Sequence, residues 1–557
     1  MKYKNEKTLA ALCLASSQKY KNLPALAMFS NGKISRKYTY QQMGKRAQEI
    51  GFLLRQLGAV KGSRVLLLSE NCPEWALFYF GIALAGSVSV PLLTGFSGEQ
   101  IQNIARHAEI SAVCLSRSFA DRFEQTAFSK IPFIYIDSIT DNENGSEITA
   151  SVNGSETQIQ LRKSEEDTLL QNNPDINAGG EDENALATII YTSGTQGNSK
   201  GVMLSGKNII SSAIFTLGYI NLNTRDRMLS VLPLAHSYEC CLGFLAPMIG
   251  GSFITYLDRP PSPSVLLPAV KIVRPTVMAA VPLLIEKIYN NGIAPKLTNS
   301  RLYKFPLTRP LAVRVAGRKL ISALGGSIRY VGIGGSPLSP EVEKFLRGAR
   351  FPYAIGYGLT ETAPLTAGSK ALKFPIRCVG TPPKGVKIRI VKHASIKEPG
   401  VGEIQIKGPH VMLGYYNDAE RTAEAFTQDG WLRTGDLGRA GKKNRLFISG
   451  RLKALILGPS GENIYPEEIE SLLGTSSLIE DALVYLGKKG ELIAMVNLTE
   501  AAKAAAGKIE NTLEDLRSWV NKKLASFSRL SKIEILHEPF EKTPTMKIKR
   551  YLYGKPC

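Results

Sequence analysis

Cysteine and histidine are scarce in this chain. Its 557 residues include seven cysteines, widely spaced apart from Cys240 and Cys241, and no two of them form a CxxC pair. The five histidines are also dispersed. A disulfide-stapled secreted fold needs paired cysteines, and a zinc site needs clustered cysteine or histidine. The sequence therefore predicts reduced thiols in a cytosolic protein, with no structural disulfide, no zinc and no histidine-based metal site.

Long hydrophobic runs are missing as well. The nearest approach to a membrane span is the uncharged stretch Cys240–Leu257, but Pro247 and the Gly250–Gly251 pair interrupt it. We expect a buried helix and a strand with a break between them rather than a spanning helix. At the N-terminus the apolar run Leu9–Ala15 is short, and lysines follow it. An amphipathic first helix is predicted there, with a signal peptide as the alternative.

Acidic residues are too few to balance the cations. The chain has 69 lysines and arginines and 48 acids, a formal net charge of +21. Such an excess favours anionic partners: nucleotides, coenzyme A, anionic lipid, an acidic carrier protein or nucleic acid. Because the sequence has neither RNP-like aromatic motifs nor a zinc finger, we do not expect nucleic acid as a partner.

Part of the excess charge is concentrated in residues 296–329. Eight cations occur in this stretch with no acid between them: Lys296, Arg301, Lys304, Arg309, Arg314, Arg318, Lys319 and Arg329. The stretch is either a solvated helix face or a contact surface for an anionic partner.

What is present is typical of an α/β enzyme. Between residues 64 and 92 a Val/Leu-rich segment, an apolar helical segment and a second Val-rich segment follow one another. Similar segments recur at 111–115, 133–136, 187–191 and 276–280. This alternation predicts parallel-rich sheets covered by helices. Residues 137–183 break the pattern with twelve acids against two cations, so we expect an exposed loop there.

The character of the chain changes near Lys453. The segments that follow are short, and their pattern indicates a small α+β unit. We therefore predict a large N-terminal domain of several subdomains over residues 1–452. A small, mobile α+β C-terminal domain would span residues 453–557.

The strongest local motif is Ala187–Val202, ATIIYTSGTQGNSKGV. A buried strand leads into a Gly/Ser/Thr-rich loop that ends at Lys200. Glycines at 194, 197 and 201 allow backbone N–H groups to approach a polyphosphate, the hydroxyls of Thr192, Ser193 and Thr195 add donors, and Lys200 adds a cation. Gly201 follows the lysine, so the loop does not have the Walker spacing of ordinary P-loop NTPases.

Further motifs follow in the chain. They are LPLAHSY (232–238), GIGGSP (332–337), GYGLTET (356–362), GWLRTGDLG (430–438), GRLK (450–453) with GENIYPEEI (461–469), and TPTMKIKR (543–550). In this order they resemble the adenylate-forming superfamily, which includes acyl-CoA synthetases, peptide-synthetase adenylation domains and firefly luciferase. The TPTMKIKR ending is similar to that of bacterial long-chain fatty acyl-CoA synthetases of the AMP-forming type. Gln196 and Ser199 depart from the usual Thr and Pro of the phosphate loop.

The resemblance implies a role for each matching residue. ATP or AMP would be bound by Thr192, Ser193, Gly194, Thr195, Gly197, Lys200, Gly335, Ser336, Gly356, Tyr357, Gly358, Thr360, Asp436 and Arg451. Lys547, Lys200 and Thr360 would be catalytic, Glu361 and Thr192 would hold Mg²⁺, and His236 would line the acyl pocket. Lys453 would be the hinge about which the small domain rotates.

The chemistry agrees with these residue types. Forming an acyl adenylate brings a carboxylate to a phosphate, so cations and N–H donors must neutralise both. Apolar segments around His236 and residues 274–290 favour a medium- or long-chain fatty acid as the acid. The predicted cofactors are ATP, Mg²⁺ and coenzyme A or the phosphopantetheine of acyl carrier protein.

Alternatives remain at this point. The acceptor could be acyl carrier protein, the acid another carboxylic acid, or the chain a non-catalytic acyl- and ATP-binding regulator on the same fold. The predicted location is the cytoplasm, with peripheral contact at the inner face of an anionic membrane as an additional possibility.

Overall fold

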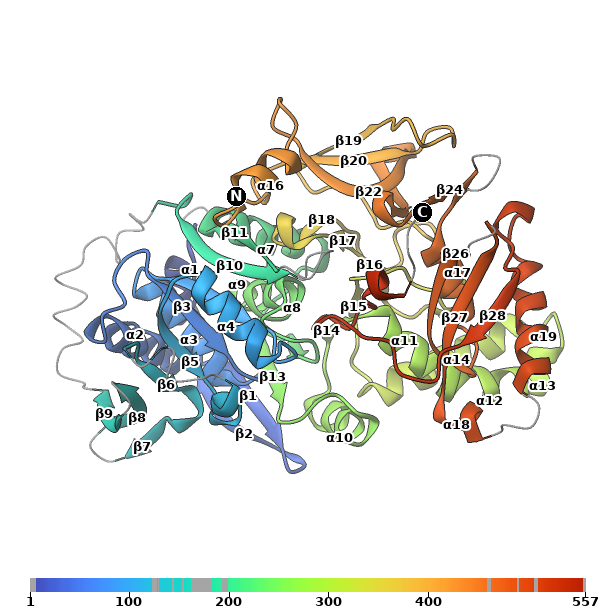
Figure 1. The fold of residues 1–557 in the computed structure, drawn as a ribbon. Coiled ribbons are helices and arrows are strands. Elements are labelled where there is room, and N and C mark those ends of the chain that lie inside the picture. The colour runs from blue at the N-terminus through green and yellow to red at the C-terminus, as the bar shows by residue number, and fades with distance from the viewer. Residues whose placement is uncertain are drawn as a thin grey trace.

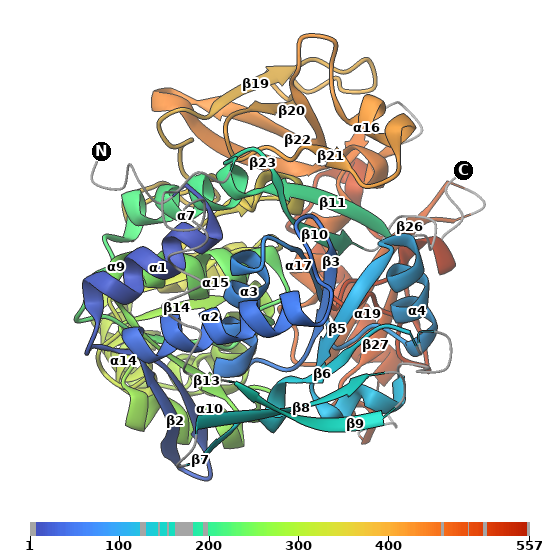
Figure 2. The ribbon, with the colours of Figure 1, turned by 90° about the vertical axis from the view of Figure 1, so that its left-hand side faces the viewer.

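The computed structural model describes residues 7–122, 128, 130–142, 145–152, 155–161, 182–192, 199–457, 462–487, 490–504 and 509–553. Two large sheets and their covering helices form the greater part of the molecule, and a smaller C-terminal unit lies beside them (Figures 1 and 2). The α/β class with parallel-rich sheets is therefore confirmed.

The first sheet has ten strands in the order β21-β11-β10-β4-β3-β5-β6-β8-β7, with β9 paired to β8. Its central strands, from β10 to β6, are parallel. They include the strands predicted near 64–92, 111–115, 133–136 and 187–191. The bounds are β3 (Arg64–Leu68), β4 (Val88–Leu92), β5 (Ile110–Leu115), β6 (Phe133–Tyr135), β10 (Leu186–Thr192), β11 (Lys200–Ser205) and β21 (Gly414–Tyr415).

The second sheet has seven strands in the order β16-β15-β14-β12-β13-β1-β2, all parallel except the last pair. The bounds are β1 (Pro24–Ser30), β2 (Lys33–Thr39), β12 (Arg227–Leu229), β13 (Phe253–Leu257), β14 (Val277–Ala280), β15 (Tyr330–Ile333) and β16 (Tyr353–Ile355). The loops at the carboxyl ends of β15 and β16 carry two of the predicted motifs, and that end of a parallel sheet is where ligands bind in open α/β folds.

A helix layer separates the two sheets. Helix α3 (Pro73–Leu84) is buried at every residue but Ala83 and contacts β1 of one sheet and both β3 and β4 of the other. A helix that is apolar all round needs such a position between two apolar surfaces. Gly81 allows α3 to cross closely over α2 (Tyr40–Gln56), because a Cβ there would lie 2.5 Å from Ile50 Cγ2.

Other helices pack around this layer and against the two sheets. They are α1 (Leu9–Tyr20), α4 (Gly98–His107), α7 (Gly206–Ile220), α10 (Pro263–Val273), α11 (Pro282–Ile288), α14 (Arg309–Ala323) and α15 (Pro340–Gly348). The amphipathic first helix predicted after Leu9 is thus present as α1. Cys240–Leu257 forms a π-helical turn, the short helix α9 (Ala246–Gly250) and β13, so the predicted break is confirmed. Across the described ranges, no helix combines the length and apolar character needed to cross a membrane.

The prediction for residues 137–183 was partly wrong. Strands β7 (Thr140–Asn142), β8 (Gly145–Val152) and β9 (Ser155–Leu161) extend the edge of the ten-stranded sheet. Residues 148–151 are all buried, so β8 packs into the fold along consecutive positions rather than on alternate ones. In the sequence the apolar residues Ile148, Ala150 and Val152 alternate with polar ones, and the acid count of the whole segment hid this weak pattern. Most of the rest of the segment, residues 162–181, lies outside the described residues.

Two further units complete the chain (Figure 1). An antiparallel sheet is built from β19 (Lys387–Val391), β20 (Gly402–Lys407), β22 (Leu432–Gly441) and β23 (Arg445–Arg451). The C-terminal unit contains β24 (Ile456–Leu457), β25 (Asn463–Ile464), α17 (Pro466–Leu473), β26 (Ile479–Leu486), β27 (Leu492–Leu498), α18 (Glu500–Ala504), α19 (Ile509–Asn521) and β28 (Lys532–Ile535). It has a hydrophobic core of its own around Ile469, Leu473 and Val496.

Candidate active site

Lys200 and Thr192 face each other across the base of the predicted phosphate loop. They are partners in the antiparallel register of β10 and β11. Both line a cleft of about 3190 Å³. The loop between them, with Ser193, Gly194, Thr195 and Gly197, lies outside the described residues. The hairpin therefore places the two ends of the loop at the cleft, as the motif requires.

A tyrosine connects Lys200 to the predicted magnesium ligand. The hydroxyl of Tyr415, on β21, donates a hydrogen bond of 2.9 Å to Glu361 Oε1 and accepts one of 3.4 Å from Lys200 Nζ. The ammonium group also lies 4.6 Å from the centre of the Tyr415 ring. Burial lowers the pKa of Lys200, and the negative charge of Glu361 opposes this effect. One carboxylate, a hydroxyl at Thr192 and free space beside them fit Mg²⁺, which needs few protein ligands.

Asp436 is an almost fully buried acid at the wall of the cleft. It is paired in register with Arg451 across β22 and β23, and Arg451 Nε lies 3.1 Å from its Oδ1. The hydroxyl of Tyr357 donates a hydrogen bond of 2.8 Å to its Oδ2. Burial raises the pKa of Asp436, while Arg451 and Tyr357 act in the opposite direction. A desolvated carboxylate held by two donors at the cleft wall can accept hydrogen bonds from the hydroxyls of a ribose.

The glycine-rich motifs bring backbone close to the same cleft. Gly335 and Ser336 follow β15, while Gly356 and Gly358 flank Tyr357 after β16, and all four line the cleft. A side chain at Gly358 is excluded, because its Cβ would lie 1.6 Å from the carbonyl oxygen of Pro364. Thr360 and Glu361 begin the short helical turn Thr360–Thr362 that follows. The GYGLTET motif therefore places the hydroxyl of Thr360 and the carboxylate of Glu361 at the cleft, next to glycines, whose backbone is not covered by a side chain of its own.

His236 lies at the start of the short helix α8 (Ser237–Glu239) and also lines the cleft. Its Nδ1 accepts a hydrogen bond of 3.1 Å from the backbone N–H of Tyr238, so Nε2 carries the proton of the neutral ring. Burial, with a smaller contribution from the charge of Lys547, lowers the pKa of His236 to about 4. His236 is therefore neutral at neutral pH, and a neutral ring can line an apolar pocket without the desolvation penalty of a charged group.

Lys547 enters the cleft from the C-terminal unit. The Thr543 N–H donates to the Lys547 carbonyl at 2.7 Å and closes a tight loop, and Pro544 in that loop lies directly beside Gly95. Burial and the charge of Arg451 lower the pKa of Lys547, while the carboxylates of Glu467, Asp436 and Glu361 raise it. The loop therefore holds a cation among the acids of the site. Lys453 lines the cleft as well.

Tyr415 and Glu467 were missed by the sequence analysis. Glu467 lines the cleft and lies in the GENIYPEEI motif, where nothing distinguishes it from its neighbours. Tyr415 lies in a two-residue strand outside every recognised motif, and only the pairing of β21 with β11 brings it beside Lys200. Its one signal in the sequence is the aromatic pair Tyr415–Tyr416 after a glycine.

Replacing Tyr415 by phenylalanine should lower kcat/KM for ATP about tenfold, because one hydrogen bond to charged partners is lost. The Mg²⁺ concentration needed for half-maximal rate should rise, since Glu361 loses the donor that orients it. Tyr416→Phe is the matched control: Tyr416 packs edge-on against His107, with ring centres 5.8 Å apart. Equal kinetics in the two variants would show that the Tyr415 hydroxyl has no positioning role.

Glu239 is a second buried acid, at the end of α8. Ser230 Oγ donates a hydrogen bond of 2.6 Å to its Oε1, and Oε2 has no partner among the described residues. Burial raises the pKa of Glu239 from 4.5 to about 8. The folded chain therefore keeps a proton that the unfolded chain releases between these values, so stability falls as pH rises through this window.

Glu239→Gln should remove this pH dependence. We expect the difference in thermal unfolding midpoint, variant minus wild type, to increase as pH is raised from about 5 to about 8. Wild type loses stability over this range, whereas the amide of the variant does not titrate. The effect is at most about 1.4 kcal/mol per pH unit. Because the midpoint difference is compared between two pH values, any loss of stability that the substitution causes equally at both values cancels. A difference between the two proteins that stays constant with pH would show that Glu239 is not protonated in the folded state.

Comparison with known proteins identifies the family. The pattern of the family described as AMP-binding enzyme matches residues 14–416. This chain belongs to the AMP-binding enzyme family. It is 31% identical to long chain acyl-CoA synthetase 1 of Arabidopsis thaliana, over 82% of this chain and 73% of that one. It is 27% identical to the long-chain-fatty-acid–[acyl-carrier-protein] ligase AEE15 of the same plant, over 92% and 81% of the two chains.

Solved structures share the fold. The o-succinylbenzoate CoA synthetase MenE of Bacillus subtilis, in complex with the acyl-adenylate intermediate, superposes with a TM-score of 0.72 at 23% identity, over 97% of each chain. The predicted superfamily and the predicted α/β class are both confirmed. Every predicted site residue that the structure describes lines the same cleft of this AMP-binding enzyme.

Proposed function

We propose that this chain is an AMP-forming ligase for a medium- or long-chain fatty acid, with coenzyme A as the thiol acceptor. The observation that carries the proposal is the convergence of Lys200, Asp436 and Lys547 on one cleft. The lining continues into apolar side chains that suit an alkyl chain: Ile220, Leu242, Val281, Leu283 and Leu297. Each buried CH₂ group of a fatty acid contributes about 0.8 kcal/mol in such surroundings.

The charges of the site suit the formation of an acyl adenylate. A carboxylate oxygen of the acid bonds to the α-phosphorus of ATP, and the bond to pyrophosphate breaks. Lys547 is the cation that would neutralise both anions as they meet, Lys200 would hold the β- and γ-phosphates, and Thr360 would donate to the α-phosphate. Asp436, Tyr357 and Arg451 would fix the nucleoside. Glu361 and Thr192 would hold Mg²⁺, whose charge offsets that of the phosphates.

Thioester formation needs Lys547 to leave the site, and we assign that motion to residues 453–557, moving against residues 1–452 with Lys453 as the hinge. The ion pairs between the two parts support this assignment. Arg377 lies 2.8 Å from Glu468, and Lys287 lies 3.5 Å from Glu480, with all four side chains well exposed. Exposed pairs of this kind contribute little free energy each, so they can be exchanged during rotation.

Acyl carrier protein is the second candidate acceptor, because its phosphopantetheine presents the same thiol and one relative bears its name. The proposed setting is the cytoplasm, with peripheral contact on an anionic membrane.

The decisive experiment is a product assay with oleate or palmitate, ATP and Mg²⁺, run with coenzyme A and separately with acyl carrier protein. We expect AMP and pyrophosphate, with thioester in one of the two arms. A short aromatic acid is the control for another carboxylic acid as substrate. Release of ADP and phosphate would contradict the proposal. Tight binding of ATP and acid with no pyrophosphate exchange would instead indicate a regulator.

A further inference from the structure

Large apolar side chains are exposed in a short part of the basic stretch. Helix α13 (Arg301–Lys304) and the beginning of α14 are joined by a loop that contains Phe305 and Leu307. Leu307 is 96% exposed and Phe305 is 67% exposed. The exposed apolar residues of this region are Leu302, Phe305, Leu307, Leu311 and Val315. Scattered exposed apolar residues need no explanation, but a contiguous group of them marks an interaction site.

Cations are interleaved with these apolar residues. No aspartate or glutamate occurs between residues 287 and 340. On α14 the exposed positions recur every three or four residues, which places Leu311, Arg314, Val315 and Arg318 along one helix face. The exposed cations of the region are Arg301, Lys304, Arg309, Arg314, Arg318 and Lys319, and within the described parts of the chain none of them forms an ion pair. We call these six cations and the five apolar residues the docking surface.

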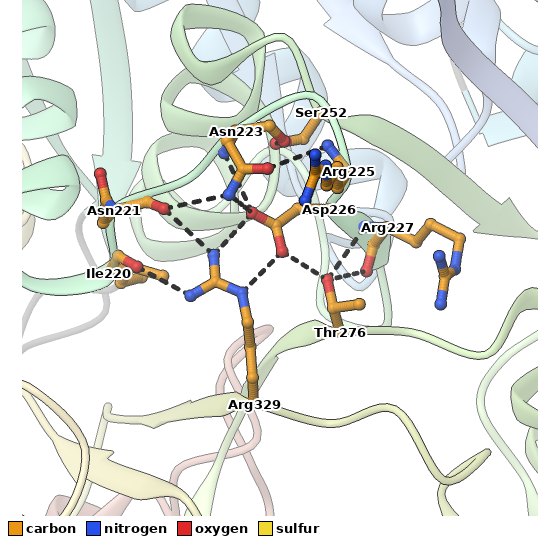
Figure 3. A network of polar contacts seen from close by, with 9 residues as sticks. All are labelled: Ile220, Asn221, Asn223, Arg225, Asp226, Arg227, Ser252, Thr276 and Arg329. Carbon is orange, nitrogen blue, oxygen red and sulfur yellow. Dashed lines mark hydrogen bonds and ion pairs between the residues drawn. The ribbon is translucent and has the colours of Figure 1, made fainter.

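Arg329, the last cation of the stretch, does not belong to this surface (Figure 3). Its Nε and Nη2 lie 2.7 and 2.6 Å from the two oxygens of Asp226, which is almost fully buried. Thr276 Oγ1 donates a further hydrogen bond of 2.8 Å to the same carboxylate. The expectation of eight uncompensated cations was therefore wrong for Arg329, because an acid more than one hundred residues away in the chain pairs with it.

The docking surface borders the active-site cleft. Tyr303, Arg309 and Arg314 line the cleft and also lie within this segment. The guanidinium of Arg309 lies over the Tyr303 ring, 5.0 Å from its centre. An apolar molecule taken up beside Leu307 would therefore be next to the cleft rather than on a remote face.

We propose that the docking surface binds an anionic lipid bilayer. The cations would contact lipid phosphates, and Leu302, Phe305, Leu307 and Leu311 would enter the boundary between headgroups and acyl chains. An acidic carrier protein could pair its carboxylates with the cations, but it would offer no apolar region in which Leu307 and Phe305 could be buried. A bilayer offers both lipid phosphates and acyl chains, so we favour the bilayer as the binding partner. The part of this proposal that rests on the proposed function is the substrate: a fatty acid would leave the bilayer and enter the neighbouring cleft. Binding of the bilayer itself does not depend on it.

Sedimentation with vesicles of phosphatidylcholine and phosphatidylglycerol in equal parts tests the charges. The variant changes Arg301, Lys304, Arg318 and Lys319 to glutamine, none of which lines the cleft. We expect the affinity for these vesicles to fall tenfold or more, because each cation near an anionic bilayer contributes favourably to binding and four are removed. Binding of wild type should weaken with salt, as the Debye length falls from about 10 Å at 0.1 M to about 3 Å at 1 M.

A matched control changes four exposed cations in and beside the antiparallel sheet of β19, β20, β22 and β23 to glutamine: Lys384, Lys387, Lys442 and Lys443. It removes the same net charge and should bind vesicles like wild type. Equal losses in the two charge variants would mean that only total charge matters, which would overturn the proposal.

Leu307→Trp tests insertion into the bilayer. Its fluorescence, above that of the three native tryptophans, should shift to shorter wavelength on adding these vesicles but not on adding acyl carrier protein. Leu307→Ser with Phe305→Ser should weaken vesicle binding and leave the fold intact, since both side chains are exposed. Absence of vesicle binding by wild type at low salt, or a charge effect confined to acyl carrier protein, would overturn the proposal. Vesicle binding requires no turnover, so its result is separate from that of the product assay.

Discussion

Replacement of Lys547 by alanine should slow formation of the acyl adenylate by about 10²–10³-fold. Lys547 lines the cleft together with Asp436, Glu361 and Glu467, and burial lowers its pKa while the charges of these carboxylates raise it. A positioned cation at such a site stabilises the charge that develops when carboxylate and phosphate meet, and water replaces it poorly. Pyrophosphate exchange, which reports the first half-reaction alone, measures the effect.

The same substitution should leave the second half-reaction nearly unchanged, because the proposed rotation removes Lys547 from the site before the thiol attacks. Thioester formation from pre-made acyl adenylate and coenzyme A tests this directly. Lys549→Ala is the matched control: it removes a lysine two positions along the same loop, where Lys549 Nζ pairs with Glu541 at 3.0 Å. Similar losses in both half-reactions, or in both variants, would show that Lys547 acts through the fold of the loop.

Replacement of Asp436 by asparagine should weaken binding of ATP and AMP by about tenfold to a hundredfold. Hydrogen bonds to a charged acceptor contribute about 1.5–3 kcal/mol each, and the amide offers one acceptor oxygen where the carboxylate offers two. The KM for the fatty acid should change little. Titration calorimetry with AMP separates binding from catalysis. An unchanged affinity for AMP would remove Asp436 from the nucleotide site.

The pH dependence of AMP binding gives a second measurement on the same residue. Burial raises the pKa of Asp436, so its carboxylate becomes protonated at a higher pH than an exposed aspartate. Binding by wild type should therefore weaken as pH falls through that raised pKa, while the profile of Asp436→Asn should be flatter. Asp429→Asn is the control, because Asp429 lies in the turn before β22 and pairs at the surface, at 2.7 Å, with Arg389 of the same sheet.

Much of the architecture could be predicted from local pattern. The strands β3, β4 and β5 are largely apolar runs, and such runs have few alternatives to a position inside a covered parallel sheet. The break in Cys240–Leu257 followed from one proline and two glycines. The hairpin β8–β9 was missed for the opposite reason: its apolar pattern is weak, and it joins the sheet through pairing of β8 with the edge of β6, which local pattern does not reveal.

The sequence by itself determined the superfamily, the α/β class and the described residues that line the cleft, because the motifs of the predicted phosphate loop, the predicted ribose-binding acid and the tail lysine are each recognisable from a few neighbouring residues. Only the tertiary structure decided which charged side chains pair with each other and which remain unpaired among the described residues. It paired Arg329 with Asp226, linked Lys200 to Glu361 through Tyr415, and left the cations of the docking surface beside exposed leucines. Charge pairs depend on distances between side chains that chain order does not specify, since residues far apart in the chain become neighbours only when strands and helices pack.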